Sequence, residues 1–468
     1  MRVTTRALAA VAVAALLAAG CSRAGTTSST TPSASSASST GGSVTSSGST
    51  TGASFGSVTN VCHGGSPSGS PDQGVTANSI TVGVLTDEQY TKDPQLVNAA
   101  KVFTSWCNAA GGIDGRQLVA DIHQTDLMAV TSAMTAACAK DFVLAGGSAA
   151  LDGIAVGVRL KCLLPDYDAQ PVMPQNLGSG LELQPYNYNS TYSSFAGFYK
   201  FVMTKYPDSA QHIGILSGQS VITQVDSEAD TDTVKALGGT VAYNGTFPVT
   251  GAINWTPYAE TLKNKGIKGL TLYDTPQQAI ALEQALDNIG YKLDWINPNT
   301  NSYATSFIQL AGKALTEQTN YAPLPGVYPV EKAKDNAAVE QLVTLFSKYA
   351  PGQPITLQIL QAWSMWLLFA QSAEGCGSNL TRACAYAAAT KETSWTGGGL
   401  TAPVDESNLQ KPASCFNVEV ATPSGWQPAS IGANNGPYLC GSTPIKLPAG
   451  FPQGTQLSDV GKSLSDLK

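Results

Sequence analysis

The chain has few charged residues and few histidines for its length. Only 13% of its 468 residues are Asp, Glu, Lys or Arg, and just three are His: His63, His123 and His212. No cluster of basic residues occurs, which argues against a nucleic-acid partner. Cys-x-x-Cys pairs are missing and the histidines are scattered, so zinc or redox chemistry has little support.

Motifs of common enzyme chemistries are missing as well. The sequence contains no Walker loop and no Gly-x-Gly-x-x-Gly after a strand. The stretch from Gly146 to Ala150 approaches a nucleophile elbow but lacks its final Gly. These absences predict a protein that is not an enzyme and needs no cofactor or metal. An enzyme is the alternative that a turnover assay would test.

The first 20 residues are typical of an export signal. Arg2 and Arg6 precede an uncharged stretch that ends in small residues before Cys21. About 14 apolar residues are too few to span a bilayer, which needs roughly 20. A Cys at the cleavage point resembles the lipobox of bacterial lipoproteins, which implies lipidation of Cys21 on the outer face of the cytoplasmic membrane. The alternative is a secretory signal cut near Ala19, with Cys21 a spare thiol.

The stretch from Ser22 to Val58 is almost entirely Ser, Thr, Gly and Ala. It has too few large apolar side chains to offset the entropy of ordering, which predicts a disordered tether with a reach of about 35 Å. About 410 residues remain, enough for two lobes of ordinary size. Without the three Arg of the signal and tether, 23 basic side chains face 33 acidic ones, a net charge of −10.

Strand and helix patterns alternate along the rest of the chain. A β-rich run at Ser79–Leu85 is followed by a helical pattern at Pro94–Ala110, a strand at Leu118–His123, a helix ending near Lys140 and a strand at Asp141–Ala145. The alternation resumes between Phe195 and Ile296. Such a pattern predicts the α/β class with two parallel sheets in tandem.

Two long helices are predicted after this alternation, near Asn336–Tyr349 and Leu357–Ala373. The second is apolar nearly all round. Gln361 and Gln371 interrupt it, so a buried helix is expected rather than a membrane span. A short β section that begins at Cys415 closes the chain.

Several short motifs occur in a set order between Ser79 and Phe416. They are Ile80-Thr-Val-Gly-Val-Leu, Asn108-Ala-Ala-Gly-Gly-Ile-Asp-Gly-Arg116-Gln-Leu, Leu144-Ala-Gly-Gly-Ser148, Leu272-Tyr-Asp-Thr-Pro276 and Asn297-Pro298. Together they resemble the type I periplasmic binding proteins, and within them the leucine/isoleucine/valine-binding proteins of ABC importers. The resemblance implies two Rossmann-like lobes joined by a three-segment hinge, a small-molecule ligand, an ABC permease as partner, and a monomer.

This resemblance also implies an organisation of the chain. The expected parts are a signal peptide (1–20), a lipid-anchored linker (21–60), lobe I (61–188 plus 326–396), lobe II (189–325 plus 397–445) and a C-terminal tail (446–468). The hinge crossings are expected near Gln184–Asn189, Ala322–Tyr328 and Gly397–Val404. The alternative function is that of a sensor, which binds the same kind of ligand and signals to a membrane receptor or kinase. A sensor would share every one of these features.

Ligands of open α/β sheets bind beyond the carboxyl ends of the strands. With two lobes, the expected contact residues are Thr86, Tyr90, Gly147, Ser148, Tyr188, Ser217, Tyr273, Asp274 and Asn299. Backbone N–H groups and the hydroxyl at Gly147 and Ser148 suit a carboxylate or another acceptor group. A plain tight turn is the alternative there.

Asn299 stands where family members that bind amino acids place an acid for the ligand's ammonium group. Asp274 could substitute for this acid or could be a structural acid at a helix start. The departure puts an α-amino acid in doubt, and an amide, another neutral metabolite or an aromatic compound becomes comparable.

Eight cysteines follow Cys21, an even number that predicts four disulfides in an exported protein. The strand order 2-1-3-4 of such a lobe lets the second and third helices end together. The pairs expected on this topology are Cys62–Cys107, Cys138–Cys162, Cys376–Cys384 and Cys415–Cys440.

Overall fold

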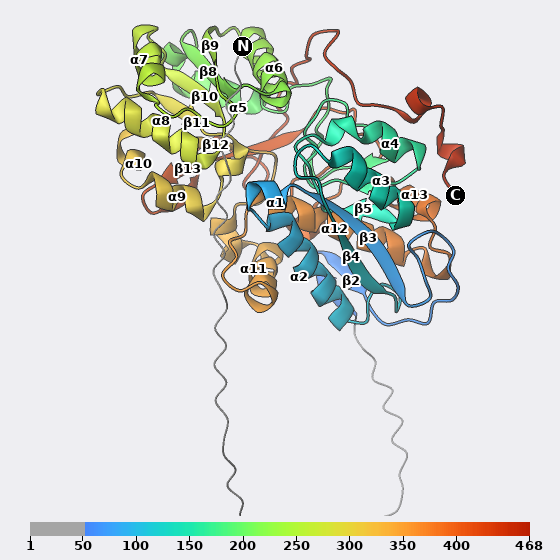
Figure 1. The fold of residues 1–468 in the computed structure, drawn as a ribbon. Coiled ribbons are helices and arrows are strands. Elements are labelled where there is room, and N and C mark those ends of the chain that lie inside the picture. Colours follow the sequence, from blue (N-terminus) through green and yellow to red (C-terminus); the bar gives the residue numbers. More distant parts are fainter. Residues whose placement is uncertain (1–51) are drawn as a thin grey trace, which may run out of the picture. The chain divides into compact units, whose positions relative to one another are not determined.

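The computed structural model describes residues 52–468 (Figure 1). The predicted export signal, Cys21 and most of the predicted tether lie outside these residues. The predicted linker was wrong at its C-terminal end, because β1 (Ala53–Phe55) and β2 (Val58–Cys62) form an antiparallel hairpin. Phe55 is fully buried, with its ring centroid 5.1 Å from that of Trp363. A single large side chain among small ones therefore attaches this segment to the core.

Lobe I is built on a five-stranded parallel sheet. In spatial order its strands are β4 (Gln117–Gln124), β3 (Ser79–Thr86), β5 (Val143–Ala145), β6 (Asp166–Tyr167) and β7 (Glu182–Leu183). This order confirms the predicted 2-1-3-4 arrangement. It also explains why residues that follow β3, β4 and β5 lie close together.

Helices cover both faces of this sheet (Figure 1). Val82 and Val84 of β3 face a core shared with α2 (Gln95–Ala109), α11 (Ala337–Tyr349) and α12 (Leu357–Glu374). Leu85 and Leu144 face the opposite side, toward α3 (Val130–Lys140) and α4 (Val156–Lys161). The short helices α1 (Glu88–Thr91) and α13 (Arg382–Ala389) complete this part. The alternation of faces along β3 is the period-two pattern of a strand covered on both sides.

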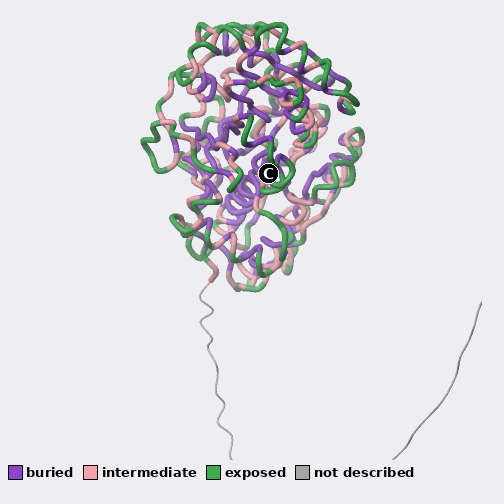
Figure 2. Tube along the Cα trace, turned by 90° about the vertical axis from the view of Figure 1, so that its left-hand side faces the viewer, coloured by how far each residue is buried: buried purple, intermediate pink, exposed green. Residues whose placement is uncertain are grey.

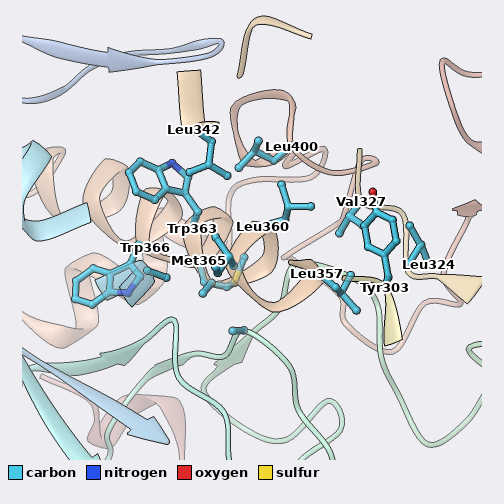
Figure 3. Close-up of a cluster of buried hydrophobic side chains, with 14 of the residues drawn as sticks. Tyr303, Leu324, Val327, Leu342, Leu357, Leu360, Trp363, Met365, Trp366 and Leu400 are labelled. Atoms are coloured by element: carbon cyan, nitrogen blue, oxygen red, sulfur yellow. The ribbon is translucent and has the colours of Figure 1, made fainter. Parts of the chain in front are cut away.

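The α12 helix is the most deeply buried element of this core. Its residues Trp363 and Trp366 have no exposed surface, and the buried positions run all round the helix. In Figure 2 the buried residues, in purple, gather in the interior and the exposed residues, in green, lie toward the outside. Figure 3 shows Leu342 beside Trp363, with Val327 and Tyr303 near Leu357. This confirms the predicted buried helix. Within residues 52–468, no helix combines the length and the apolar character needed to cross a membrane.

Lobe II contains a four-stranded parallel sheet. Its strands lie in the order β11 (Trp295–Asn297), β10 (Gly269–Tyr273), β8 (Ile213–Gly218) and β9 (Val241–Phe247). The indole of Trp295 lies across Gly269, where a Cβ would be 2.2 Å from the ring. Gly269 is therefore required by this close approach.

Helices also cover both faces of the lobe II sheet. One face packs on α5 (Ala196–Lys205) and α6 (Val221–Ala236), and the other on α7 (Thr256–Asn264) and α8 (Pro276–Asn288). The helices α9 (Thr305–Ala311) and α10 (Ala314–Glu317) pack beside α8. The fold class predicted from the sequence, two parallel-sheet α/β lobes, is confirmed.

The chain passes between the two sheets three times. The passages run from β7 to α5, from β12 (Tyr321–Leu324) to α11, and from the turn at Gly397–Gly399 to β13 (Cys415–Thr422). β12 and β13 pair antiparallel, and β13 also pairs with β14 (Gly425–Pro428) and β15 (Leu439–Cys440). The extent of each lobe stays a prediction.

The C-terminal tail packs back on the protein. Ser193 and Leu447 donate backbone hydrogen bonds to Ile445 (2.9 Å) and Thr191 (2.9 Å), so the tail pairs with the first hinge passage. Further on, Leu457 and Leu467 join a buried cluster with α4. No sequence pattern predicted this packing, because the apolar residues of the tail are not periodic.

The eight cysteines form the same four pairs that the sequence predicts. The S–S distances are 2.11 Å for Cys62–Cys107, 2.06 Å for Cys138–Cys162, 2.03 Å for Cys376–Cys384 and 2.11 Å for Cys415–Cys440. The first of these bonds ties the N-terminal hairpin to the end of α2.

The hairpin should contribute to the stability of the core. We expect Phe55→Ala to lower the free energy of unfolding by about 3–5 kcal/mol, because it leaves a cavity against Trp106 and Trp363. Urea unfolding followed by tryptophan fluorescence measures the change. Ile154→Ala, at a residue that is 55% exposed, is the control and should stay within about 0.5 kcal/mol of wild type. A Phe55→Ala protein as stable as this control would mean that the hairpin is not docked.

Candidate functional site

Asp87 holds together the loops that follow three strands of lobe I. Its Oδ2 accepts a hydrogen bond from the backbone N–H of Ala150 at 2.7 Å, and its Oδ1 accepts one from Leu127 at 3.0 Å. The hydroxyl of Thr125 donates to the same Oδ1. Asp87 is 8% exposed. A carboxylate of the protein itself therefore takes the backbone N–H of Ala150, two residues beyond the Ser148 predicted to bind a ligand.

The donors at Gly147 and Ser148 are also largely used within the protein. Ser148 donates its backbone N–H to Leu85 O (3.0 Å) and its hydroxyl to Gln170 O (2.6 Å). A Cβ at Gly147 would lie 2.6 Å from Leu85 N, so this Gly is needed for the close approach of two strand ends. These contacts favour the tight turn, which was the alternative interpretation of this motif.

The space beside this turn is too small for a metabolite. It measures about 10 Å³, room for about one water molecule. Asp152 lines it and accepts hydrogen bonds from Val172 N (2.8 Å), Met173 N (2.9 Å) and Asn176 Nδ2 (2.9 Å). Asp152 therefore fixes the loop between β6 and β7, which is the loop that borders the larger cavity described below.

The remaining predicted residues of lobe I and the hinge differ in exposure. Thr86 is 2% exposed and its Oγ1 accepts a hydrogen bond from Glu88 N (3.2 Å). Tyr90, in α1, is 61% exposed. Tyr188 is buried, and its hydroxyl accepts a hydrogen bond from Gln361 Nε2 of α12 (3.1 Å). Tyr188 therefore anchors the first hinge passage to the core helix.

In lobe II, Asn299 ties two strand ends together. Its Nδ2 donates to Asp274 O (2.6 Å), and its Oδ1 accepts from Asn301 N (2.9 Å). Asp274 accepts a hydrogen bond from Thr275 N (2.7 Å) through Oδ1, and burial raises its pKa to about 6. Ser217 is 1% exposed, and its Oγ has no partner within the described residues.

Tyr273 belongs to a buried polar cluster that sequence reasoning missed. The hydroxyls of Tyr273 and Tyr199 both donate to Oδ2 of Asp230, each at 2.5 Å. Tyr199 also lies 2.9 Å from Thr271 Oγ1. Asp230 is 3% exposed. The cluster joins α5, α6 and β10 around a single carboxylate.

This cluster borders a cavity that contacts both lobes. The cavity measures about 70 Å³, compared with about 10 Å³ for the space beside the Gly147 turn. This is less than the 300–1,000 Å³ of common ligand pockets, so in this arrangement of the lobes it has room for only part of a metabolite. Val172 and Pro174 of lobe I, Asn189 of the first hinge passage, Asp226 and Asp230 of α6, Tyr273 of β10 and Phe451 of the tail line it. Among the predicted contact residues, Tyr273 is the one that borders this cavity.

Both acids of the cavity resist ionisation. Burial raises the pKa of Asp230 to about 6 in spite of its two phenol donors. Burial and the charge of Asp230 raise the pKa of Asp226 to about 8. The same burial raises the pKa of Tyr199 and Tyr273, so both phenols remain protonated donors.

The sequence did contain a signal for this pair of acids. Asp226 and Asp230 are four residues apart in a helical pattern, which places them on one face of α6. Buried Ser227 and Val234 of the same helix show that this part of α6 faces inward. Acids at this spacing on the inward face of a helix are unusual, and they mark the position that the strand-end rule overlooked.

One group of side chains in lobe I has the composition of a metal site. Ligand atoms of Asp121, His123 and Asp141 lie within 4.8 Å of one another. His123 Nε2 is 2.6 Å from Asp141 Oδ2, and Lys140 Nζ is 2.5 Å from Asp121 Oδ2. Burial opposes ionisation of Asp121, but Lys140 and His123 outweigh it and lower its pKa. The charges are thus compensated within the group, which describes an ion-pair network.

Two parallel-sheet lobes, three passages between them and a cavity that both lobes border define a solute-binding protein. The chain belongs to the periplasmic binding protein family, whose model, described as "Periplasmic binding protein", matches residues 79–420. Proteins of this family are substrate-binding components of transporters that act outside the cytoplasm with ABC permeases. They are not enzymes, in agreement with the prediction.

Solved structures show the same fold. A fatty acid ABC transporter substrate-binding protein from Thermomonospora curvata is 17% identical, with a TM-score of 0.64 over 84% of this chain and 100% of that one. The isoleucine complex of the branched-chain amino acid transporter substrate binding protein LivJ from Streptococcus pneumoniae is 16% identical, with a TM-score of 0.58 over 75% and 99%.

A leucine binding protein, LivK, from Thermotoga maritima is 11% identical, with a TM-score of 0.59 over 75% of this chain and 98% of that one. Curated protein sequences give no match. These identities are low, so the similarity establishes the fold and leaves the ligand open.

The role of Asp87 is testable by removing its acceptors. We expect Asp87→Ala to lower the free energy of unfolding by about 3 kcal/mol or more, because it leaves three donors without an acceptor at roughly 1–3 kcal/mol each. Urea unfolding measures this change. Asp208→Ala removes an acid of an exposed ion pair and should change stability by less than about 1 kcal/mol. An Asp87→Ala protein that matches the Asp208→Ala protein would exclude this bridging role.

Proposed function

We propose that the protein is an extracytoplasmic solute-binding lipoprotein of an ABC importer that captures a small polar metabolite. The observation that carries this proposal is the cavity bordered by the β6–β7 loop of lobe I, the first hinge passage and α6 of lobe II, which measures about 70 Å³. A ligand in such a cavity contacts both lobes, so its binding stabilises one arrangement of them. That arrangement is what a permease would recognise.

We further propose that Tyr273 contacts the ligand from lobe II, with Ser217 and Asp274 at neighbouring strand ends. Ser217 Oγ and Asp274 Oδ2 are enclosed and lack partners within residues 52–468, so they are available to a polar ligand. Tyr90 is exposed in the loop after β3, where a ring could cover a ligand. Gly147, Ser148 and Asn299 are better explained as structural residues, since their polar groups bind neighbouring loops.

A thermal-shift screen tests the binding function directly. The screen compares amino acids, amides, purines and aromatic acids with the untreated protein. A ligand at 100 times its dissociation constant should add about 2.7 kcal/mol to the stability of the folded state. Tyr273→Phe keeps the ring but removes the hydroxyl, and it should weaken binding of any hit that bonds to this group. Failure of every class of small molecule to stabilise the protein would argue against a solute-binding role.

Lipid anchoring through Cys21 is the second part of the proposal. It is supported by the basic start, the short apolar stretch and the small residues before Cys21. The tether after it would let the folded part reach a permease while staying at the membrane.

We expect the full chain, expressed in a bacterium that processes lipoproteins, to separate with the membrane fraction and to incorporate a labelled fatty acid. Cys21→Ala should lose the label, because the acylated sulfur is gone. Cys62→Ala removes a different thiol and should keep it, provided that the protein is still exported. Equal labelling of wild type and Cys21→Ala would contradict the anchor.

A further inference from the structure

The acids of the cavity have no basic partner. Asp226 and Asp230 are the charged residues of its lining, and no Lys or Arg borders it. Neither acid takes part in an ion pair among the described residues. Two carboxylates four residues apart on a helix repel each other when both are ionised. The negative charge of the two acids is therefore not balanced by a positive charge in the lining of the cavity.

The two carboxylates also keep free acceptor atoms. Oδ2 of Asp230 is used by the two phenols, but its Oδ1 makes no hydrogen bond within the described residues, although the residue is 97% buried. Asp226 makes none with either oxygen in this part of the chain. Asp230 is buried with one oxygen unpaired, which is costly, and Asp226 is half-buried, so these oxygens are suited to donors that arrive with a ligand.

The walls around the acids are mostly apolar. Tyr192, Phe195, Tyr273 and Phe451 contribute aromatic rings, and Leu447 and Val172 contribute aliphatic side chains. Aromatic faces attract organic cations as well as apolar groups. The cavity thus combines carboxylate acceptors with a surface that favours apolar groups of a ligand.

We propose that the ligand is an organic ammonium compound whose nitrogen binds between Asp226 and Asp230 and whose apolar body packs against the aromatic walls. The ligand would have no carboxylate next to that nitrogen. This inference rests on the proposed solute-binding function and names the class of its ligand.

Two other ligands that carry a positive charge, a calcium ion and an amino acid, fit the cavity less well. Calcium takes six to eight oxygen ligands, whereas this lining offers two carboxylates among mostly carbon surfaces. A zwitterionic amino acid brings a carboxylate, for which the lining has no Lys or Arg, and the donors near Ser148 are occupied by Asp87, Leu85 and Gln170. An ammonium compound without a carboxylate avoids both difficulties.

The raised pKa values of the two acids agree with this assignment. The titratable groups that face them are Tyr199 of α5 and Tyr273 of β10, which stay protonated, while Lys446 of the tail lies over the ring of Tyr192 at 5.9 Å and pairs with neither acid. At neutral pH, Asp226 is then largely protonated in the free protein. Binding of an ammonium ion should release that proton.

The test uses two series of compounds that differ only in charge. The first is phenethylamine, phenylalanine, 2-phenylethanol and 3-phenylpropionate. The second is 3-methylbutylamine, leucine, 3-methylbutanol and 4-methylpentanoate. Isothermal titration of residues 52–468, which contain both lobes and the tail, measures affinity for each, and calcium chloride is titrated as a separate arm.

The variants are Asp226→Asn and Asp230→Asn, with Glu228→Gln as the matched control. Glu228 lies on the same helix and is exposed, so its replacement removes one charge without touching the cavity. Asp230→Asn could unfold, because it weakens the hydrogen bonds from the two phenols. Asp226→Asn breaks no hydrogen bond within the described residues, so it tests the proposal even if Asp230→Asn is unfolded. Thermal unfolding of each free variant confirms that it is folded.

We expect at least one amine to bind, and to bind at least about tenfold more tightly than its alcohol, acid and amino acid counterparts. Asp226→Asn should weaken that binding at least about tenfold, and Glu228→Gln should change it less than twofold. Binding of the amine should also release protons, seen as a heat that depends on the ionisation enthalpy of the buffer.

Other results would overturn the inference. Preferred binding of an alcohol, an acid or an amino acid would leave the solute-binding function intact and exclude the ammonium class. Unchanged amine affinity in Asp226→Asn would place the site elsewhere, and tight binding of calcium would assign the acids to a metal. If no compound of either series binds, the ammonium inference is contradicted, and the thermal-shift screen decides separately whether the protein binds a solute.

Discussion

The hydrogen bonds from Tyr199 and Tyr273 to the Asp230 carboxylate are the interaction on which the site depends. They connect α5, α6 and β10 through one buried group, and so fix the position of Tyr273 at the end of its strand. A Leu in place of Asp230 could pack in the same space, but it would accept no hydrogen bond from the two phenols. The buried carboxylate is unfavourable by itself, and no Lys or Arg lines the cavity that Asp230 borders. The hydrogen bonds from the two phenols thus hold the wall of the cavity in place, and a cationic ligand can balance the charge of the acids.

The other walls of the cavity are held by separate means. Asp152 binds the loop at Val172 and Met173, and the C-terminal tail pairs with the first hinge passage beside Tyr192. Behind that loop, the lobe I sheet packs on α12, whose Trp363 and Trp366 are fully buried. Because these walls belong to different lobes and to the tail, a ligand that fills the cavity couples them to one another. This coupling is the physical basis for recognition by a transporter partner.

Much of the fold could be predicted from the sequence, and the reason is periodicity. β3, α2 and α12 each have a clear period and end near turn residues, so their bounds fall close to those expected. Elements without a period were missed. The hairpin at Ala53–Cys62 has one decisive residue, Phe55, and the tail is held by hydrogen bonds and a few leucines. For the site, the strand-end rule found Tyr273 but not its partner Asp230, which lies on α6, the helix after β8. Asp230 becomes visible only when α6 is folded against β10. The same rule favoured Ser148, whose donors are taken by neighbouring loops that no local pattern reveals.

The central claim is that Asp226 and Asp230 are acids without a cationic partner in the free protein. Carbon-13 NMR of the protein labelled at Asp side chains, with Asp226→Asn and Asp230→Asn used for assignment, measures this directly. The account predicts that the two carboxyl signals titrate at pKa values of about 8 and about 6, far from the ordinary value near 4. It also predicts that a bound amine shifts both values downward. Titration of both groups near 4 in the free protein would show that their charges are already compensated, and it would contradict the account.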